Sequence, residues 1–182
     1  GGAQLTISQS IINGNAGGGI FSMNSPFTIV GNIFFNNGSN TSLIGGVALG
    51  IGASTTNRLD FNSFSLNTTQ DGIGPAIQCN GTFTASNNIM SNNRSATKMD
   101  QVGGTCLHTY SIARPGVVPP GTGDIASDPM FVDPSKGDLH IQATSPARHA
   151  ADPAADLSGI ASKDIDGDTR GARADMGADE IP

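Results

Sequence analysis

The sequence predicts an all-β protein, a right-handed parallel β-helix of about five rungs with an irregular C-terminal capping tail. Three observations support this fold class. First, 13% of the residues are charged and most polarity comes from Asn, Ser, Thr and Gly, which form helices poorly. Second, five stretches of the first two thirds share one pattern. Third, all fifteen Asn lie between Asn13 and Asn93, and an acidic, proline-rich region follows.

The five similar stretches begin at Leu5, Phe27, Arg58, Phe83 and Cys106. Repeats of this length without helical periodicity are typical of leucine-rich repeats, propeller blades or β-helices. The leucine-rich consensus is absent and propeller blades are longer, so parallel coils fit best. Unequal spacing is expected in coils, because an insertion such as residues 39–57 can leave one corner as a loop.

Within this alignment one column is apolar and its neighbour is polar. The apolar column contains Ile11, Ile33, Phe64, Ile89 and Ile112. The polar column contains Ser10, Asn32, Ser63, Asn88 and Ser111. Since successive side chains of a strand point to opposite faces, we expect the apolar column to stack as an interior ladder and the polar column to stack opposite it.

Asparagine also suits the turns of a coil, because it tolerates left-handed backbone and its side chain bonds neighbouring amides. Five asparagines lie in N-x-Ser/Thr motifs: Asn37, Asn40, Asn67, Asn80 and Asn93. We expect turn ladders here, with glycosylation as the alternative.

The composition changes near Arg114. Twelve of the fifteen acidic residues and eight of the ten prolines follow it. The terminal unit of a solenoid needs a different composition, because proline and acidic side chains discourage further stacking. We therefore expect repeats over residues 1–114, and final strands with an acidic, proline-rich cap of the same domain over residues 115–182.

The tail carries five recognisable segments. They are DPMFVDP (128–134), GDLHI (137–141), SPA (145–147), DIDGDTR (164–170) and DMGADE (175–180). Together with the repeats, they make the chain resemble the C-terminal part of bacterial secreted or surface parallel β-helix proteins, of the choice-of-anchor or polymorphic-outer-membrane-like kind with a pectin-lyase-like fold. The chain departs from that pattern at residues 148–151, where RHAA replaces I-D-A-G. The resemblance implies export to the bacterial surface or medium, and no single activity.

Two classes of function are compatible with such a coil. The first is a structural, adhesive or carbohydrate-binding role, with a polysaccharide or cell-surface ligand; the alternative is a polysaccharide lyase or glycoside hydrolase, or a fragment of one. Hydrolases need clustered carboxylates, and lyases need a basic residue near a metal. The repeats contain only Asp60, Asp71 and Asp100, with Arg58 on the strand face of Asp60. We therefore predict no catalytic residue, no cleavage of pectin, alginate or glucan, and weak sugar binding at residues 39–57 and the Asn turns.

One motif indicates a cation. Asp164, Asp166 and Asp168 alternate along the chain, as oxygen ligands do in calcium loops. The sixth position is Thr169 rather than Gly, and no helices flank the loop, so we expect these aspartates to cap turns and pair with Arg170 or Arg173, with calcium binding as the alternative. We therefore expect no cofactor, with calcium as the one candidate.

Other partners follow from charge and pattern. A net charge of −6 argues against nucleic acid, and no apolar run is long enough for a membrane span. The first rung is expected to present an open edge, which favours end-to-end self-association or contact with upstream chain. Cys79 and Cys106 can form one disulfide or remain two buried thiols. Packing or turn hydrogen bonds are expected for His108, His140 and His149.

Overall fold

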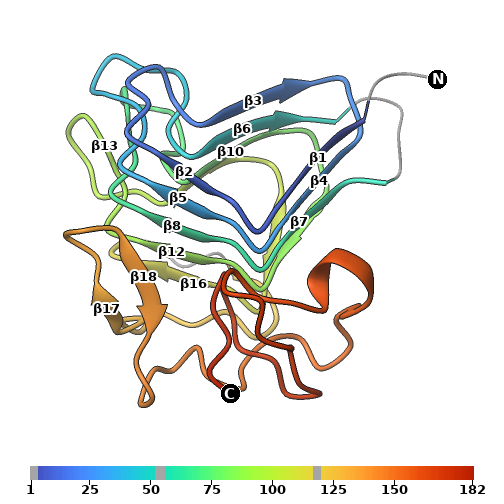
Figure 1. The fold of residues 1–182 in the computed structure, drawn as a ribbon. Coiled ribbons are helices and arrows are strands. Elements are labelled where there is room, and N and C mark those ends of the chain that lie inside the picture. Colours follow the sequence, from blue (N-terminus) through green and yellow to red (C-terminus); the bar gives the residue numbers. More distant parts are fainter. Residues whose placement is uncertain (1–3, 52–55, 117–119) are drawn as a thin grey trace.

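The computed structural model describes residues 4–51, 56–116 and 120–182, and it is a parallel β-helix (Figure 1). Sheet A contains β1 (Leu5–Ser8), β4 (Phe27–Val30), β7 (Arg58–Asp60), β11 (Thr84–Ser86) and β15 (Leu107–Thr109). Sheet B contains β2 (Ile11–Asn13), β5 (Ile33–Phe35), β8 (Ser63–Ser65), β12 (Ile89–Ser91) and β16 (Ile112–Arg114). Sheet C contains β3 (Ile20–Met23), β6 (Val47–Gly50), β10 (Ile77–Asn80) and β14 (Val102–Gly104).

Sheet C has four strands, whereas sheets A and B have five each. The solenoid therefore makes about four turns rather than the five rungs expected, because the chain leaves the coil after β16. Two further short strands, β9 (Thr68–Thr69) and β13 (Arg94–Ser95), pair in the segments that connect sheet B to sheet C. The tail contains the antiparallel pair β17 (Phe131–Asp133) and β18 (Asp138–Ile141), and one 3-10 turn, η1 (Gly159–Ala161).

The interior of the coil is filled by apolar side chains that stack in columns from turn to turn. Phe34 and Phe64 lie on successive turns, and their rings stack with centroids 4.7 Å apart. Met90 and Ala113 continue the same column in β12 and β16. Facing them from sheets A and C are Ile29, Leu59, Leu49 and Ile77, all almost fully buried. The coil thus has a continuous apolar core along its axis.

Two ladders of amide side chains, buried except at Asn15, follow the corners of the coil. In the first, at the bend between sheets A and B, Asn32, Asn62 and Asn88 are fully buried. The Oδ1 atom of each later asparagine accepts the backbone N–H and the side-chain N–H of the equivalent asparagine one turn earlier in the chain. Asn62 accepts both from Asn32 at 3.0 Å. The second ladder contains Asn15, Asn37, Asn67 and Asn93, and it ends on Gln101. Asn37, Asn67 and Asn93 of the N-x-Ser/Thr motifs are therefore confirmed as ladder members, whereas Asn40 and Asn80 belong to neither ladder of the described residues.

The predicted register of the third repeat is wrong by one residue. Ile33 and Ile89 both pair with Ser63, so Ser63 takes the position that was expected for Phe64. Asn62 correspondingly takes the ladder position that was expected for Ser63. The alternation of apolar residues in this repeat fits either register, which explains the error.

The side of the isoleucine column also differs from the expectation. Ile33, Ile89 and Ile112 point to the outside of sheet B, where they pack with tail residues including Leu139 and Met176. Ile11, in the first turn, is 60% exposed. Both faces of sheet B are therefore mainly apolar, and the tail buries the outer one beyond the first turn.

The tail first pairs with the last turn and then runs along the outside of the coil (Figure 1). The backbone N–H of Tyr110 donates to the carbonyl of Thr122 at 2.8 Å. Farther along, the Gln9 side chain of the first turn donates to the carbonyl of Asp164 at 2.8 Å. The Ser63 hydroxyl accepts the N–H of Ala178 at 3.0 Å. The tail therefore contacts the first, the middle and the last turns.

Two remaining expectations concern the cysteines and the first turn. Cys79 and Cys106 are joined by a disulfide, one of the two possibilities left open. Residues 1–3 lie outside the described residues, and Ile11 and Phe21 of the first turn are 60% and 64% exposed. Self-association at this end stays a prediction.

Candidate functional site

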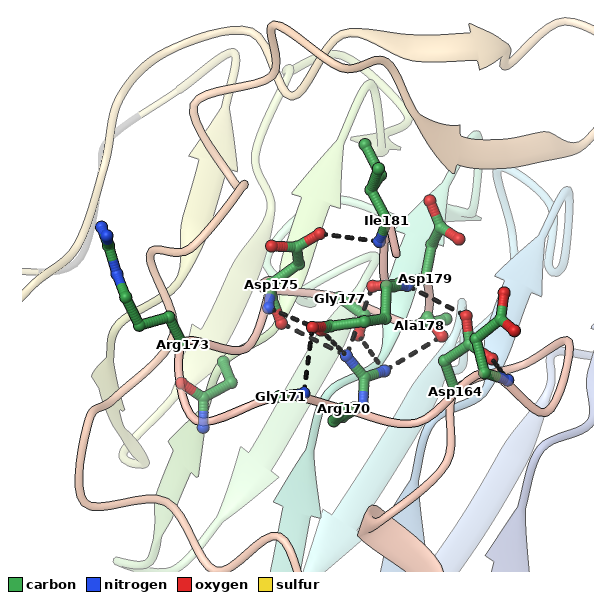
Figure 2. A network of polar contacts seen from close by, with 12 residues as sticks. Asp164, Arg170, Gly171, Arg173, Asp175, Gly177, Ala178, Asp179 and Ile181 are labelled. Carbon is green, nitrogen blue, oxygen red and sulfur yellow. Dashed lines mark hydrogen bonds and ion pairs between the residues drawn. The ribbon is translucent and has the colours of Figure 1, made fainter.

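The three aspartates of the predicted calcium site lie in the loop of residues 163–169, and Figure 2 shows the first of them, Asp164. Asp164 is fully buried, and its Oδ1 accepts hydrogen bonds from the backbone N–H groups of Asp166 and Asp168 at 3.0 and 2.7 Å. Its Oδ2 accepts the N–H of Glu180 at 3.0 Å. Asp166 and Asp168 are exposed. Asp164 thus closes the loop through backbone contacts, and calcium binding by the three carboxylates stays a prediction.

Arg170 follows this loop and is the centre of a buried network (Figure 2). Its guanidinium forms an ion pair with Glu180, with 3.4 Å between Nη1 and Oε2. It also donates to backbone carbonyls of four residues: Asp175, Gly177, Ala178 and Asp179. Its other face lies over the Phe61 ring at the bend between sheets A and B, 4.5 Å from the ring centroid. Arg170 therefore attaches the end of the chain to the coil.

Two opposing effects act on the pKa of Arg170 in this network. Burial lowers the pKa of Arg170, and the Glu180 carboxylate opposes that shift. Arg173, the other partner considered for the aspartates, is exposed and points away from the network in Figure 2. The aspartates at 164, 166 and 168 form no ion pair with either arginine among the described contacts.

The pair of Arg58 and Asp60, the strand-face pair of the repeats, is turned towards the tail. The Nη2 atom of Arg58 donates to Asp60 Oδ2 at 3.0 Å and to the carbonyl of Asp156 at 2.6 Å. Asn87 donates to the other oxygen of Asp60 at 2.8 Å. Burial raises the pKa of Asp60, and the hydrogen bonds from Asn87 and Arg58 oppose the shift. This pair joins the coil to the tail.

Three histidines have distinct environments. His108 occupies the interior column of sheet A, and burial lowers its pKa to about 4. His149 lies beside the carbonyl of Arg173. His140 on β18 lies between two carboxylates, with Nδ1 2.6 Å from Asp138 and Nε2 2.7 Å from Asp166. Burial lowers the pKa of His140, but the hydrogen bonds to both aspartates outweigh it, and the pKa is raised.

The sequence pattern alone does not bring His140 together with the aspartates around it. His140, Asp166 and Asp179 each offer a ligand atom, and these atoms lie within 4.8 Å of one another. All three residues belong to the recognised tail segments, which was the available signal. Their separations along the chain carry no metal-binding spacing, so only the packing of the tail reveals the cluster.

A shallow groove of about 470 Å³ follows the second corner of the coil. Its lining residues are Asn36, Leu66, Thr68, Asn92, Arg94 and Met99. Asn36, Leu66 and Asn92 occupy equivalent positions on three successive turns, each with positive φ between 52° and 57°. This conformation turns their side chains outwards while the next residue of each turn enters the buried amide ladder. Weak sugar binding was expected at residues 39–57 and at the Asn turns; this groove lies at the turns, and none of its lining residues belongs to 39–57. Within that segment residues 47–50 form β6 rather than a loop, and residues 52–55 lie outside the described residues.

A second groove of about 320 Å³ adjoins the first at Asn92. It lies between β12 and the tail and includes Ser91, Asp128, Met130 and Gln142. The two grooves together offer amide, hydroxyl, guanidinium and carboxylate groups beside the apolar side chains of Leu66, Met99 and Met130. That combination can form hydrogen bonds with a polyhydroxylated chain while covering its apolar faces.

No helix of the described residues is long and apolar enough to cross a membrane. Comparisons of the chain with protein-family models, with curated proteins and with solved structures found no match.

Proposed function

We propose that the chain is a non-catalytic β-helix module of an exported bacterial protein, which binds polysaccharide in the corner groove. The observation that carries this proposal is the stacking of Asn36, Leu66 and Asn92 along an open groove. Turns of a parallel coil repeat about every 4.8 Å. This spacing is comparable to the advance of one sugar ring along an extended chain, so equivalent residues can meet successive rings.

The charge of the groove favours an acidic sugar. Arg94 is exposed and lies beside Leu66 and Met99, which are 37% and 44% exposed. A guanidinium presents donors in a planar fork that matches a carboxylate. A uronate with its carboxylate on Arg94 and its ring face on Leu66 would satisfy both kinds of contact.

A binding role is favoured over catalysis by the contacts of two of the three carboxylates of the repeats. Asp60 is buried against Arg58 and Asn87. Asp71 accepts hydrogen bonds from Ser95 and Thr97. Hydrolysis needs two carboxylates across one glycosidic bond, and these two are engaged elsewhere on the coil. The disulfide between Cys79 and Cys106 supports export, because such bonds persist in oxidising compartments.

The test is a panel of pectate, alginate and neutral glucans, scored for binding by affinity electrophoresis and for cleavage by released reducing and unsaturated ends. Arg94→Ala and Leu66→Asn should weaken binding at least fivefold. Asparagine is chosen at position 66 because it tolerates the positive φ of that position. Matched controls are Arg173→Ala and Leu107→Asn, which replace exposed residues outside the groove.

Binding that is unchanged in both Arg94→Ala and Leu66→Asn would refute the proposal that polysaccharide binds in this groove. Saturable cleavage that Asp60→Ala abolishes would show instead that the chain is an enzyme.

A further inference from the structure

We propose that His140, Asp166 and Asp179 form a binding site for a divalent transition-metal ion, of which zinc is the representative. The three residues come from β18, from the loop of residues 163–169 and from the last segment of the chain. Their candidate ligand atoms lie within 4.8 Å of one another. The site is separate from the corner groove and does not depend on the proposed polysaccharide binding.

Asp138 orients the imidazole for this role. Its Oδ1 lies 2.6 Å from Nδ1 of His140 and also accepts the backbone N–H of His140 at 3.2 Å. A carboxylate on one ring nitrogen is the usual outer contact of a metal-binding histidine, because it sets which nitrogen carries the proton. With the proton on Nδ1, the lone pair of Nε2 points towards Asp166.

That arrangement requires a positive charge between the two groups. Nε2 of His140 lies 2.7 Å from Oδ2 of Asp166, and two lone pairs do not face each other at that distance. Either a second proton on the imidazole or a metal ion fills the position. Asp138, Asp166 and Asp179 leave a net negative charge even around an imidazolium, whereas a dication compensates more of it.

The donor set favours a transition metal over calcium. One imidazole nitrogen with carboxylate oxygens suits zinc and its neighbours, while calcium takes six to eight oxygens. Ligand bonds to zinc are about 2.1 Å, so Nε2 and Oδ2 must separate to roughly 3.0 to 3.5 Å. The side chain of Asp166 is 56% exposed and can move outwards, and that of His140 is 39% exposed, so an ion can enter from solvent.

Asp179 supplies the fixed part of the site. It is 7% exposed, and its Oδ2 accepts the backbone N–H of Ile141 at 2.8 Å. A metal bound here would link β18 to two later segments of the tail. Since the tail buries the outer face of sheet B, occupancy should also raise the thermal stability of the whole chain.

The experiment uses the chain without an affinity tag, freed of metal by a chelator and then titrated calorimetrically with zinc chloride at pH 7.5. We expect one zinc ion per chain and an upward shift of the melting temperature. His140→Ala and Asp166→Asn should each weaken zinc binding at least tenfold and remove the shift. Nitrogen-15 NMR of the imidazole should show metal binding at Nε2 rather than at Nδ1.

Two controls separate this site from general acidity. His149→Ala removes another tail histidine, and Asp168→Asn removes the neighbouring exposed carboxylate of the same loop; neither should change zinc affinity. A parallel titration with calcium chloride should give weaker binding. Absence of zinc binding, affinity unchanged by His140→Ala, or tighter binding of calcium that is lost in Asp168→Asn would each overturn the proposal. Circular dichroism of every variant shows whether its fold is kept.

Discussion

Replacing Asn62 with alanine tests the amide ladder at its centre. The Asn62 side chain is fully buried, and its Oδ1 accepts two hydrogen bonds from Asn32. The two N–H bonds of its amide are shared among three acceptors, the carbonyls of Ile29 and Asp60 and the Oδ1 of Asn88. Alanine removes all of these contacts and leaves the buried backbone N–H of Asn32 without its acceptor.

The expected cost follows from this count. A net value of about 1 kcal/mol for each of the two accepted bonds and the two N–H donors gives about 4 kcal/mol for Asn62→Ala. The free energy of unfolding of a domain is commonly about 5 to 15 kcal/mol, so Asn62→Ala should retain little stability. Asn62→Ser should cost less, because serine occupies both ends of the same column at Ser10 and Ser111. The matched control is Asn15→Ala, which removes one side-chain hydrogen bond from an exposed residue and should cost below about 1 kcal/mol.

The measurement is urea denaturation followed by far-ultraviolet circular dichroism, with the free energy of unfolding obtained by linear extrapolation. The order of stability should be wild type, Asn15→Ala, Asn62→Ser and Asn62→Ala. If Asn62→Ala cost no more than Asn15→Ala, the ladder would not stabilise the coil and the reasoning would be refuted.

Three further predictions use the same assay. Burial lowers the pKa of His108 to about 4 from 6.5, so between these values the unfolded chain binds the proton and the folded chain does not. The contribution of neutral His108 to the free energy of unfolding is therefore fully present above pH 6.5, and about 2 kcal/mol of it is lost at pH 5. The free energy of unfolding of His108→Leu should fall less between these pH values. An identical pH dependence of the two proteins would contradict this prediction. Arg170→Met should cost about 3 to 5 kcal/mol, because it removes the ion pair with buried Glu180 and the hydrogen bonds to four carbonyls; limited proteolysis should then cut the tail first, and an uncut tail would argue against this role. Ile89→Ala should cost about 2 to 5 kcal/mol although Ile89 lies outside the coil, because the tail buries it; Ile11→Ala, in the same column but 60% exposed, should cost far less, and equal losses would show that the tail does not bury this column.

The sequence by itself determined the coil and its amide ladders. Repeats of 22 to 31 residues without helical periodicity require a stacked architecture, and their Asn-rich turns identify its corners. The register could also have been obtained from the sequence. Asn32, Asn62 and Asn88 each precede a second asparagine by five residues, at positions 37, 67 and 93. That spacing places Asn62 in the ladder, whereas the apolar alternation used for the alignment fits two registers.

Only the tertiary structure decided which face of sheet B points inwards. A strand that is buried on both faces has apolar residues at both alternating positions, so Phe64 and Ile89 have no distinguishing mark in the sequence. The outer face of sheet B is buried because residues 128–181 fold over it. The same folding brings His140, Asp166 and Asp179 together from positions 13 and 26 residues apart. An irregular tail has no period from which such contacts can be inferred, because its path is set by the surface on which it packs.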